Sequence, residues 1–176
     1  YTNIFYVSIN HILALYSINY IQNYYDVLSI ILWYQFCGLG VTAGLHRLWS
    51  HRSYKAKLPT RVLLMILSSC SNQSSIYHWV RDHRVHHKNS DTDGDPHNIN
   101  RGFFFSHVGW LFVNKHLDVI NEGKKLDLTD LHNDPVVMLD KYLWPYDDIF
   151  WCYIFPGLYT LYVYDSFLKG MLLYGF

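Results

Sequence analysis

The sequence predicts an all-α integral membrane protein, and two observations carry this prediction. Of its 176 residues, 51% are hydrophobic and 18% are aromatic, a composition that favours a membrane or interfacial protein over a soluble domain. The apolar residues gather in two zones, while 13 of the 14 Lys and Arg residues lie between Arg47 and Lys141. The chain is therefore expected to consist of membrane helices flanking an aqueous middle region.

Residues 1–45 are predicted to form two transmembrane helices. The segments 4–22 and 27–45 are each long enough to cross a hydrocarbon layer of about 30 Å as a helix. Residues 23–26 supply the turn of a hairpin, and three glycines, at positions 38, 40 and 44, allow a neighbouring helix to pack closely. Basic residues follow this zone at once, namely Arg47, Arg52, Lys55 and Lys57, and the positive-inside rule therefore places residues 46–148 in the cytosol.

The middle region is expected to contain several shorter helices. Residues 58–70 are apolar but too short to span a membrane, and we expect a helix at the membrane interface, followed by a second helix from about Ile76 to Lys88. Residues 89–98 are loop by composition. The remaining expectations are a helix over 103–120 and a polar connector over 121–148.

The C-terminal zone, residues 149–176, is predicted to return to the membrane. Residues 149–164 are expected to form a third span broken at Pro156 and Gly157, and residues 166–176 begin a fourth.

Two histidine clusters in the middle region predict a metal site. On a helix, positions i, i+3 and i+4 share a face, so His83, His86 and His87 can converge. His46 and His51 are five residues apart, which leaves them roughly 140° apart around a regular helix, so they must reach a metal from a helix end or a bend. Imidazole suits iron, zinc and copper alike, and the spacing does not choose among them.

The segments HRLWSH and DHRVHH, which hold these clusters, resemble the membrane-bound acyl-CoA desaturases, most closely the animal stearoyl-CoA type. The resemblance covers roughly residues 38–140. It includes five further stretches, at residues 40–44, 52–59, 79–83, 93–98 and 101–110.

The resemblance implies a helical bundle with four membrane spans and a cytosolic helical domain that holds two iron ions (Fe²⁺). The implied ligands are His46, His51, His83, His86 and His87. His83 and His87 would share one iron with the first cluster, and His86 would face the other. Family members carry a third histidine box beyond the position that matches Phe176, so we expect the sequence to be an inactive fragment of a longer enzyme.

The resemblance also implies the reaction and its participants. The expected substrate is a fatty acyl-CoA that receives a cis double bond, most commonly between carbons nine and ten. O₂ is the oxidant, cytochrome b5 donates the electrons, and the protein is a multi-pass protein of the endoplasmic reticulum membrane with its catalytic region in the cytosol.

Several residues are expected to contact the CoA portion of the substrate. Arg81 and Asp82 match family contacts, Arg offering a fork of donors to phosphate, and Lys115 matches a further basic contact. Two neighbouring positions depart from the family pattern, because Asn114 replaces the usual Arg and Ser74 the usual Asn. These departures put the substrate preference in doubt more than the reaction type. Tyr77 and Trp79 either line the acyl tunnel or pack as ordinary aromatic residues.

Two other functions compete with a desaturase. A lipid hydroxylase can use similar histidine boxes, and only the acyl tunnel would distinguish it. A histidine-lined metal transporter should carry its ligands inside the membrane spans, whereas these clusters lie in the charged stretch. The net charge of zero gives no support for nucleic-acid binding.

Overall fold

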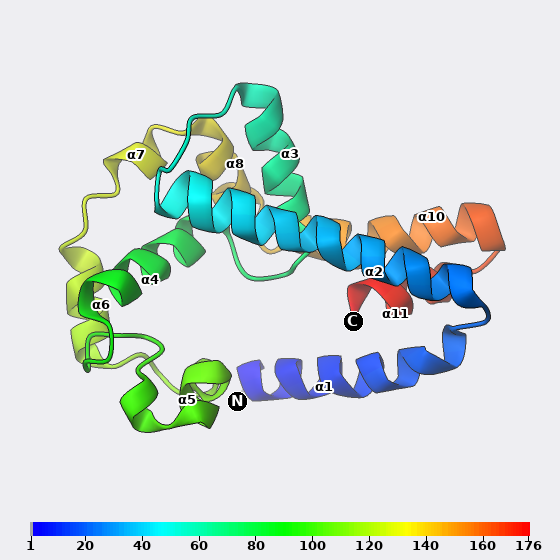
Figure 1. The fold of residues 1–176 in the computed structure, drawn as a ribbon, viewed down its shortest axis with the longest axis horizontal. Helices are drawn as coiled ribbons and strands as arrows, with labels where there is room; N and C mark the ends of the chain where they lie inside the picture. The colour runs from blue at the N-terminus through cyan, green and yellow to red at the C-terminus, as the bar shows by residue number, and fades with distance from the viewer. Residues whose placement is uncertain (1) are drawn as a thin grey trace.

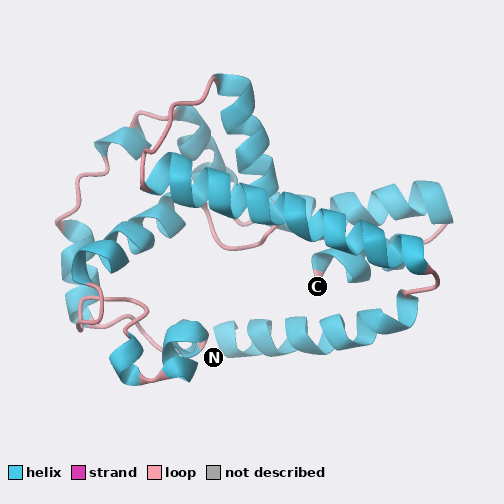
Figure 2. Cartoon of the chain, viewed as in Figure 1, coloured by secondary structure: helices cyan, strands magenta, loops and turns pink. Residues whose placement is uncertain are grey.

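The computed structural model describes residues 2–176, which form helices and loops with no strand among them (Figures 1 and 2). Helix α1 spans Thr2–Ser17 and is followed by a 3₁₀ turn, η1, at Ile18–Tyr20. Helix α2 spans Tyr24–Leu39 and begins with a capping box, in which the Asn23 side chain accepts from the Asp26 amide and Asp26 accepts from the Asn23 amide. The turn expected at residues 23–26 is therefore a helix start.

The two N-terminal helices run in opposite directions, and α11 (Phe167–Gly175) packs against both of them (Figure 1). A buried ion pair joins α11 to the start of α2, with the Lys169 ammonium 2.8 Å from Asp26 Oδ1. The hairpin expected from the sequence is thus held together by a segment far away in the chain.

Helix α2 continues without a break into η2, a π-helix at Gly40–Ser50. Within the described residues, Tyr24–Ser50 is the one helix that is long and apolar enough to cross a membrane. The first histidine cluster therefore lies at the end of this long helix, and the spans expected at 4–22 and 149–164 stay predictions.

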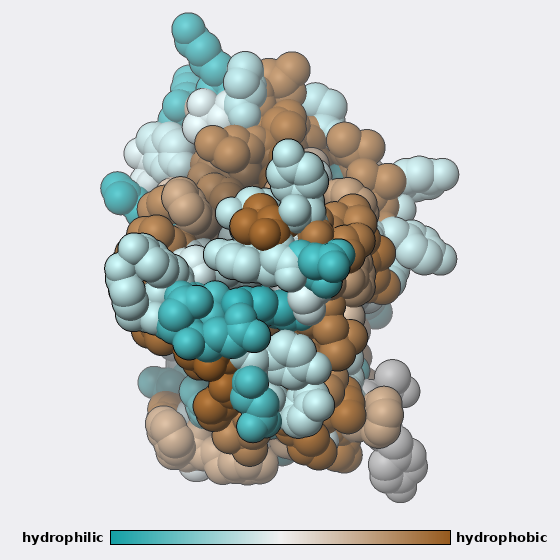
Figure 3. Space-filling model, turned by 90° about the vertical axis from the view of Figure 1, so that its right-hand side faces the viewer, coloured by the Kyte–Doolittle hydropathy of each residue, from teal (hydrophilic) through white to brown (hydrophobic). Residues whose placement is uncertain are grey.

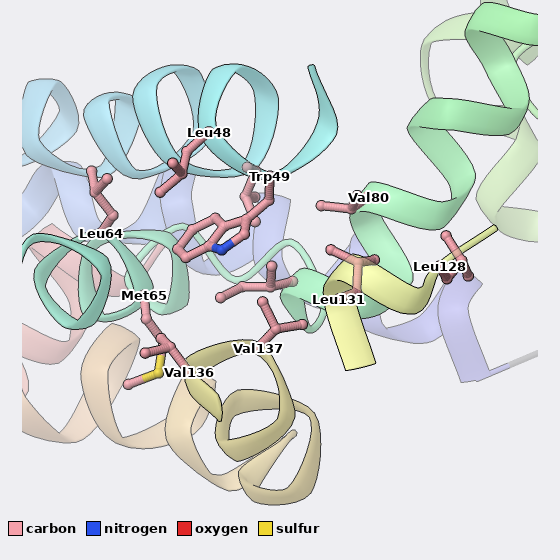
Figure 4. Packing of buried hydrophobic residues seen from close by; sticks show 11 residues of the cluster. Leu48, Trp49, Leu64, Met65, Val80, Leu128, Leu131, Val136 and Val137 are labelled. Carbon is pink, nitrogen blue, oxygen red and sulfur yellow. The ribbon is translucent and has the colours of Figure 1, made fainter. Parts of the chain in front are cut away.

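The middle region begins as expected. Helix α3 spans Leu58–Ser69 and helix α4 spans Ile76–Asn89. Both pack against η2, and a single core joins the three elements (Figure 4). Trp49 of η2, Leu64 and Met65 of α3, and Val80 of α4 meet in this core, which fixes the two histidine-bearing helices relative to each other.

The single helix expected over 103–120 is wrong. After a 3₁₀ turn, η3, at Ile99–Arg101, the chain forms α5 (Phe103–His107), a second 3₁₀ turn, η4 (Gly109–Phe112), and α6 (Leu117–Lys124). Val108 (φ −143°, ψ −29°) leaves the helical conformation after α5, and Val113 (φ −120°, ψ 160°) is extended after η4. Both residues are β-branched and favour a helix only weakly, and the helix stops at each of them.

The polar connector expected over 121–148 is also wrong, because it folds and contributes to the core. It contains α7 (Thr129–His132), α8 (Pro135–Leu143) and α9 (Tyr146–Ile149). Pro135 occupies the first turn of α8, where no amide hydrogen is needed, and Asp134 caps that helix. Four buried side chains of this segment complete the core in Figure 4, namely Leu128, Leu131, Val136 and Val137.

The break expected at Pro156 does not occur. Helix α9, the π-helical turn η5 (Phe150–Ile154) and α10 (Phe155–Tyr164) follow one another directly. The π-helical turn lies just before Pro156 and accommodates the residue that lacks an amide hydrogen.

Much of the surface of α1, α2 and α10 is apolar. Large side chains such as Phe5, Leu15, Ile31 and Tyr162 are exposed on these helices. The end of the molecule turned to the viewer in Figure 3 carries hydrophobic residues interspersed with polar ones, and a hydrophilic patch lies near its centre. Exposed apolar surface on several helices is what a lipid environment would cover.

Candidate metal centre and adjoining groove

The first histidine pair converges because its helix is a π-helix. In η2 the amide of His51 donates to the carbonyl of His46 at 3.0 Å, a hydrogen bond between residues i and i+5. This wider turn brings residues five apart onto the same side, and His51 is also the residue that caps the end of the helix. The Nε2 atoms of His46 and His51 lie 3.1 Å apart.

The second cluster sits on α4, a regular α-helix, and His83 and His87 share one face. His83 Nε2 lies 3.3 Å from His51 Nε2, and the rings of His51 and His87 are 4.6 Å apart. Potential ligand atoms of His46, His51, His83 and His87 all lie within 4.8 Å of one another. The fold therefore brings four of the five expected ligands together.

The environment of two of these imidazoles favours metal binding. Burial, reinforced by the neighbouring imidazoles, lowers the pKa of His83 to about 3. Burial also lowers the pKa of His51. A metal binds the neutral imidazole, so His51 and His83 are ready to act as nitrogen donors. A four-nitrogen donor set fits iron, zinc or copper better than magnesium or calcium, and it therefore fits the iron that the resemblance implies.

Arg84 ties the two histidine elements together, a role that the sequence did not suggest. Its guanidinium donates to the carbonyls of Trp49 and Ser50 at 2.6 and 3.3 Å, which are the last carbonyls of η2. The same group forms a salt bridge of 2.6 Å with Asp130. A cation at a helix C-terminus satisfies carbonyls that lack partners. Arg84 therefore holds the end of η2 against α4.

His86 lies apart from the four clustered imidazoles and has its own partner. Its Nδ1 atom is 2.8 Å from Oδ1 of Asp95, whose side chain is fully buried. Burial raises the pKa of Asp95, but the hydrogen bonds from His86 and from backbone amides outweigh it and hold that pKa below its ordinary value. A carboxylate that holds one nitrogen of an imidazole orients the other for a metal. The sequence assigned no such role to Asp95.

Two other side chains surround the histidines. The Trp79 ring stacks on His83, with centroids 4.7 Å apart and planes inclined by 22°. The His97 ring lies 5.4 Å from that of His86 and 4.4 Å from that of Trp110. Trp79 therefore lies beside the cluster, and His97 lies beside His86.

A groove of about 540 Å³ runs along the other side of α4, next to α6 and α7. Arg81, Asp82 and Lys115 all line it. Asp82 holds both cations, because Arg81 Nη2 lies 2.9 Å from Asp82 Oδ1 and the Lys115 ammonium contacts Asp82 Oδ2. Ser74 and Asn114 do not line this groove, and Asn114 instead lines a small depression beside it with Arg101 and Lys115.

The groove also contains residues that sequence reasoning missed. Lys124, Thr129 and His132 line it. Tyr77 lines it too, whereas the sequence suggests for this residue only an acyl tunnel or ordinary packing. His132 has no ligand spacing to another histidine, so only the fold of residues 121–148 reveals its position. Its lining is mainly apolar, with three cations and the two carboxylates of Asp82 and Asp127, and it can take a large ligand that carries anionic groups.

Comparison with known proteins gives the family. The model of the fatty acid desaturase family matches residues 23–176. Stearoyl-CoA desaturase 5 of Bos taurus is 51% identical over 170 residues, covering 94% of this chain and 50% of the relative. The Acyl-CoA Delta-9 desaturase of Acheta domesticus is 51% identical over 140 residues, covering 80% of this chain and 39% of the relative.

The Acyl-CoA Delta(11) desaturase of Spodoptera littoralis is 54% identical over 125 residues, covering 70% of this chain and 37% of the relative. The chain thus spans about half the length, or less, of these curated relatives. The family match nevertheless covers most of the chain, including both histidine clusters and the groove. The chain therefore belongs to the fatty acid desaturase family.

Proposed function

We propose that the full-length protein is an acyl-CoA desaturase that introduces a cis double bond into a fatty acyl-CoA, most commonly at carbon nine. The convergence of four imidazoles from two helices, beside a cationic groove, carries this proposal. The names of the relatives support it, although one is named for Delta-9 and another for Delta(11). The position of the double bond is therefore the least constrained part.

The metal ligands form the first part of the proposal. One iron ion would be held by the four clustered imidazoles, those of His46, His51, His83 and His87. A second ion would be held by His86, which Asp95 orients, together with ligands from other parts of the full-length protein. When bound, the two Fe²⁺ ions would activate O₂ to remove hydrogen from an unactivated methylene pair, which no side chain can do. Arg84 would keep the two helices in register, so that the ligands stay together.

The groove would bind the CoA portion of the substrate. Arg81 and Lys115 would pair with phosphate oxygens, and Asp82 would position both cations. Ser74 and Asn114 do not line the groove. They would contact only those parts of the substrate that extend beyond it. Trp79, which stacks on His83, would border the path of the acyl chain towards the metals.

Membrane topology and partners complete the proposal. Residues 1–45 would form two spans, residues 46–148 the cytosolic catalytic region, and residues 149–176 a third span and the start of a fourth, in the endoplasmic reticulum membrane. The apolar helix at Tyr24–Ser50 and the basic residues just after it support this orientation. Cytochrome b5 would deliver electrons from the cytosolic side.

Expression of the full-length gene in a host that lacks its own desaturase tests the function. We expect new monounsaturated fatty acids by gas chromatography and mass spectrometry, and no product from a His87→Ala variant at matched protein level. Hydroxylated fatty acids without new double bonds would instead support a lipid hydroxylase. Protease protection of a tag at Gly123 in sealed microsomes would contradict the proposed topology.

A further inference from the structure

An aromatic pair from two separate helices lines the groove. Tyr77 of α4 and His132 of α7 both line the groove, and their rings lie 5.2 Å apart with planes inclined by 58°. The Tyr77 hydroxyl is 3.4 Å from His132 Nε2. This contact fixes the edge of the tyrosine ring against the imidazole.

Tyr77 is also held from the side away from the groove. The ammonium of Lys141 lies 3.7 Å from the centre of the Tyr77 ring, and Lys141 is not among the residues that line the groove. A cation over one face of a phenol ring is an attractive contact, which keeps the ring in place. The ring is thus supported on one side, and it borders the groove on the other.

The aromatic pair lies one helical turn from the cations. Tyr77 and Arg81 are four residues apart on α4, which puts them on the same face and about 6 Å apart along the axis. Arg81 and Lys115 gather around Asp82 at that point. The groove therefore offers an anion-binding part and a flat aromatic part in succession, which is the order of phosphate and base in a nucleotide.

Resting on the proposed function, we propose that Tyr77 and His132 bind the adenine ring of the CoA substrate while Arg81 and Lys115 bind its phosphates. The base stacks against Tyr77, because every nucleobase has a flat π face that an aromatic side chain can cover. His132 keeps the tyrosine ring in its orientation and adds an aromatic edge. Tyr77 and His132 thereby set the specificity for a nucleotide-bearing carrier.

Equilibrium binding to the full-length protein in detergent tests this assignment with two probes, free CoA and 4′-phosphopantetheine, which lacks the adenosine part. We expect Tyr77→Leu to weaken CoA binding about tenfold or more and His132→Ala about three- to fivefold, with phosphopantetheine binding unchanged. Tyr77→Phe keeps the ring and should bind CoA within about twofold of wild type. Asn133→Ala, next to His132 but outside the groove, serves as the matched control.

The results separate this inference from the proposed function. If wild-type protein binds CoA and Arg81→Ala weakens that binding, but Tyr77→Leu and His132→Ala do not, the adenine assignment alone is wrong. Equal losses for CoA and phosphopantetheine would also overturn it. Wild-type protein that binds neither CoA nor acyl-CoA contradicts the proposed function itself. Should Tyr77→Leu fail to fold, the ratio of CoA to phosphopantetheine affinity in His132→Ala decides.

Discussion

The two histidine boxes reach one place by different helical geometries. In the first, residues five apart converge because η2 is a π-helix with hydrogen bonds from i to i+5. In the second, residues four apart converge because α4 is a regular α-helix. The comparison teaches that the histidine spacing has no meaning by itself. The helix type decides which spacing brings two ligands together.

The sharpest way to break this comparison is to give the second box the spacing of the first. In a His87→Lys, Lys88→His double variant, the imidazole moves about 100° around α4 and leaves the cluster. We expect desaturation to fall by more than about 100-fold, since loss of outer partners alone costs about 10- to 100-fold. Product is measured by gas chromatography beside a Lys88→Ala control. Activity near wild type would contradict the conclusion that the helix type determines which histidine spacing brings the ligands together.

A smaller effect is expected where one imidazole depends on a carboxylate. Asp95→Asn keeps the size of the side chain but removes the charge that orients His86. We expect activity to fall about 10- to 100-fold, and iron per polypeptide to fall by up to about half because only the ion at His86 is affected. The matched control is Asp93→Asn, which removes the same charge from an exposed residue of the same loop. If both variants behave alike, the buried Asp95–His86 contact has no part in the site.

Two glycines of the continuous helix formed by α2 and η2 test how closely this helix packs against α3. A Cβ atom at Gly40 would lie 2.3 Å from the backbone of Leu67 and Ser68, whereas a Cβ at Gly38 meets nothing within 4 Å. Gly40→Ala should therefore destabilise the protein by about 1–3 kcal/mol. Gly38→Ala should be neutral or stabilising by up to about 1 kcal/mol, because alanine favours a helix. Thermal unfolding in detergent compares the pair, and equal midpoints would contradict the close packing.

The smallest expected effect concerns pH and the start of α4. Asp140 is buried and accepts from the Ile76 amide at 2.7 Å. Burial, with the nearby Asp147 and Asp148, raises the pKa of Asp140 to about 8. The folded protein therefore holds a proton there that the unfolded chain releases, and stability should fall as pH rises from the ordinary carboxyl range towards 8.

Asp140→Asn removes this titration but keeps an oxygen that can accept from Ile76. Between pH 5 and pH 6, we expect wild-type protein to lose about 1–2 kcal/mol more stability than this variant. Unfolding midpoints at several pH values give the difference, with the exposed Asp118→Asn variant as control. Parallel pH profiles for wild type and Asp140→Asn would show that folding does not raise the pKa of this carboxyl.

The parts that could be predicted from the sequence are those that local periodicity determines. The positions of α3 and α4 and the separate direction of His86 follow from apolar runs and from the 3.6-residue turn. The π-helix could not be predicted, because the spacing of His46 and His51 does not show whether hydrogen bonds run from i to i+4 or from i to i+5. The groove was missed for a related reason. Residues 121–148 look polar, and their four core side chains show only in the fold.

Iron content tests the central claim, that the two boxes form one metal centre, most directly. The full-length protein is purified as wild type and as His46→Ala, His83→Ala and His107→Ala, the last removing an exposed imidazole stacked on Phe103 outside the cluster. Iron per polypeptide should fall by at least half in both cluster variants, because each imidazole supplies a coordinate bond, and should be unchanged in His107→Ala. Full iron content in His46→Ala and His83→Ala, or an equal loss in His107→Ala, would contradict the account.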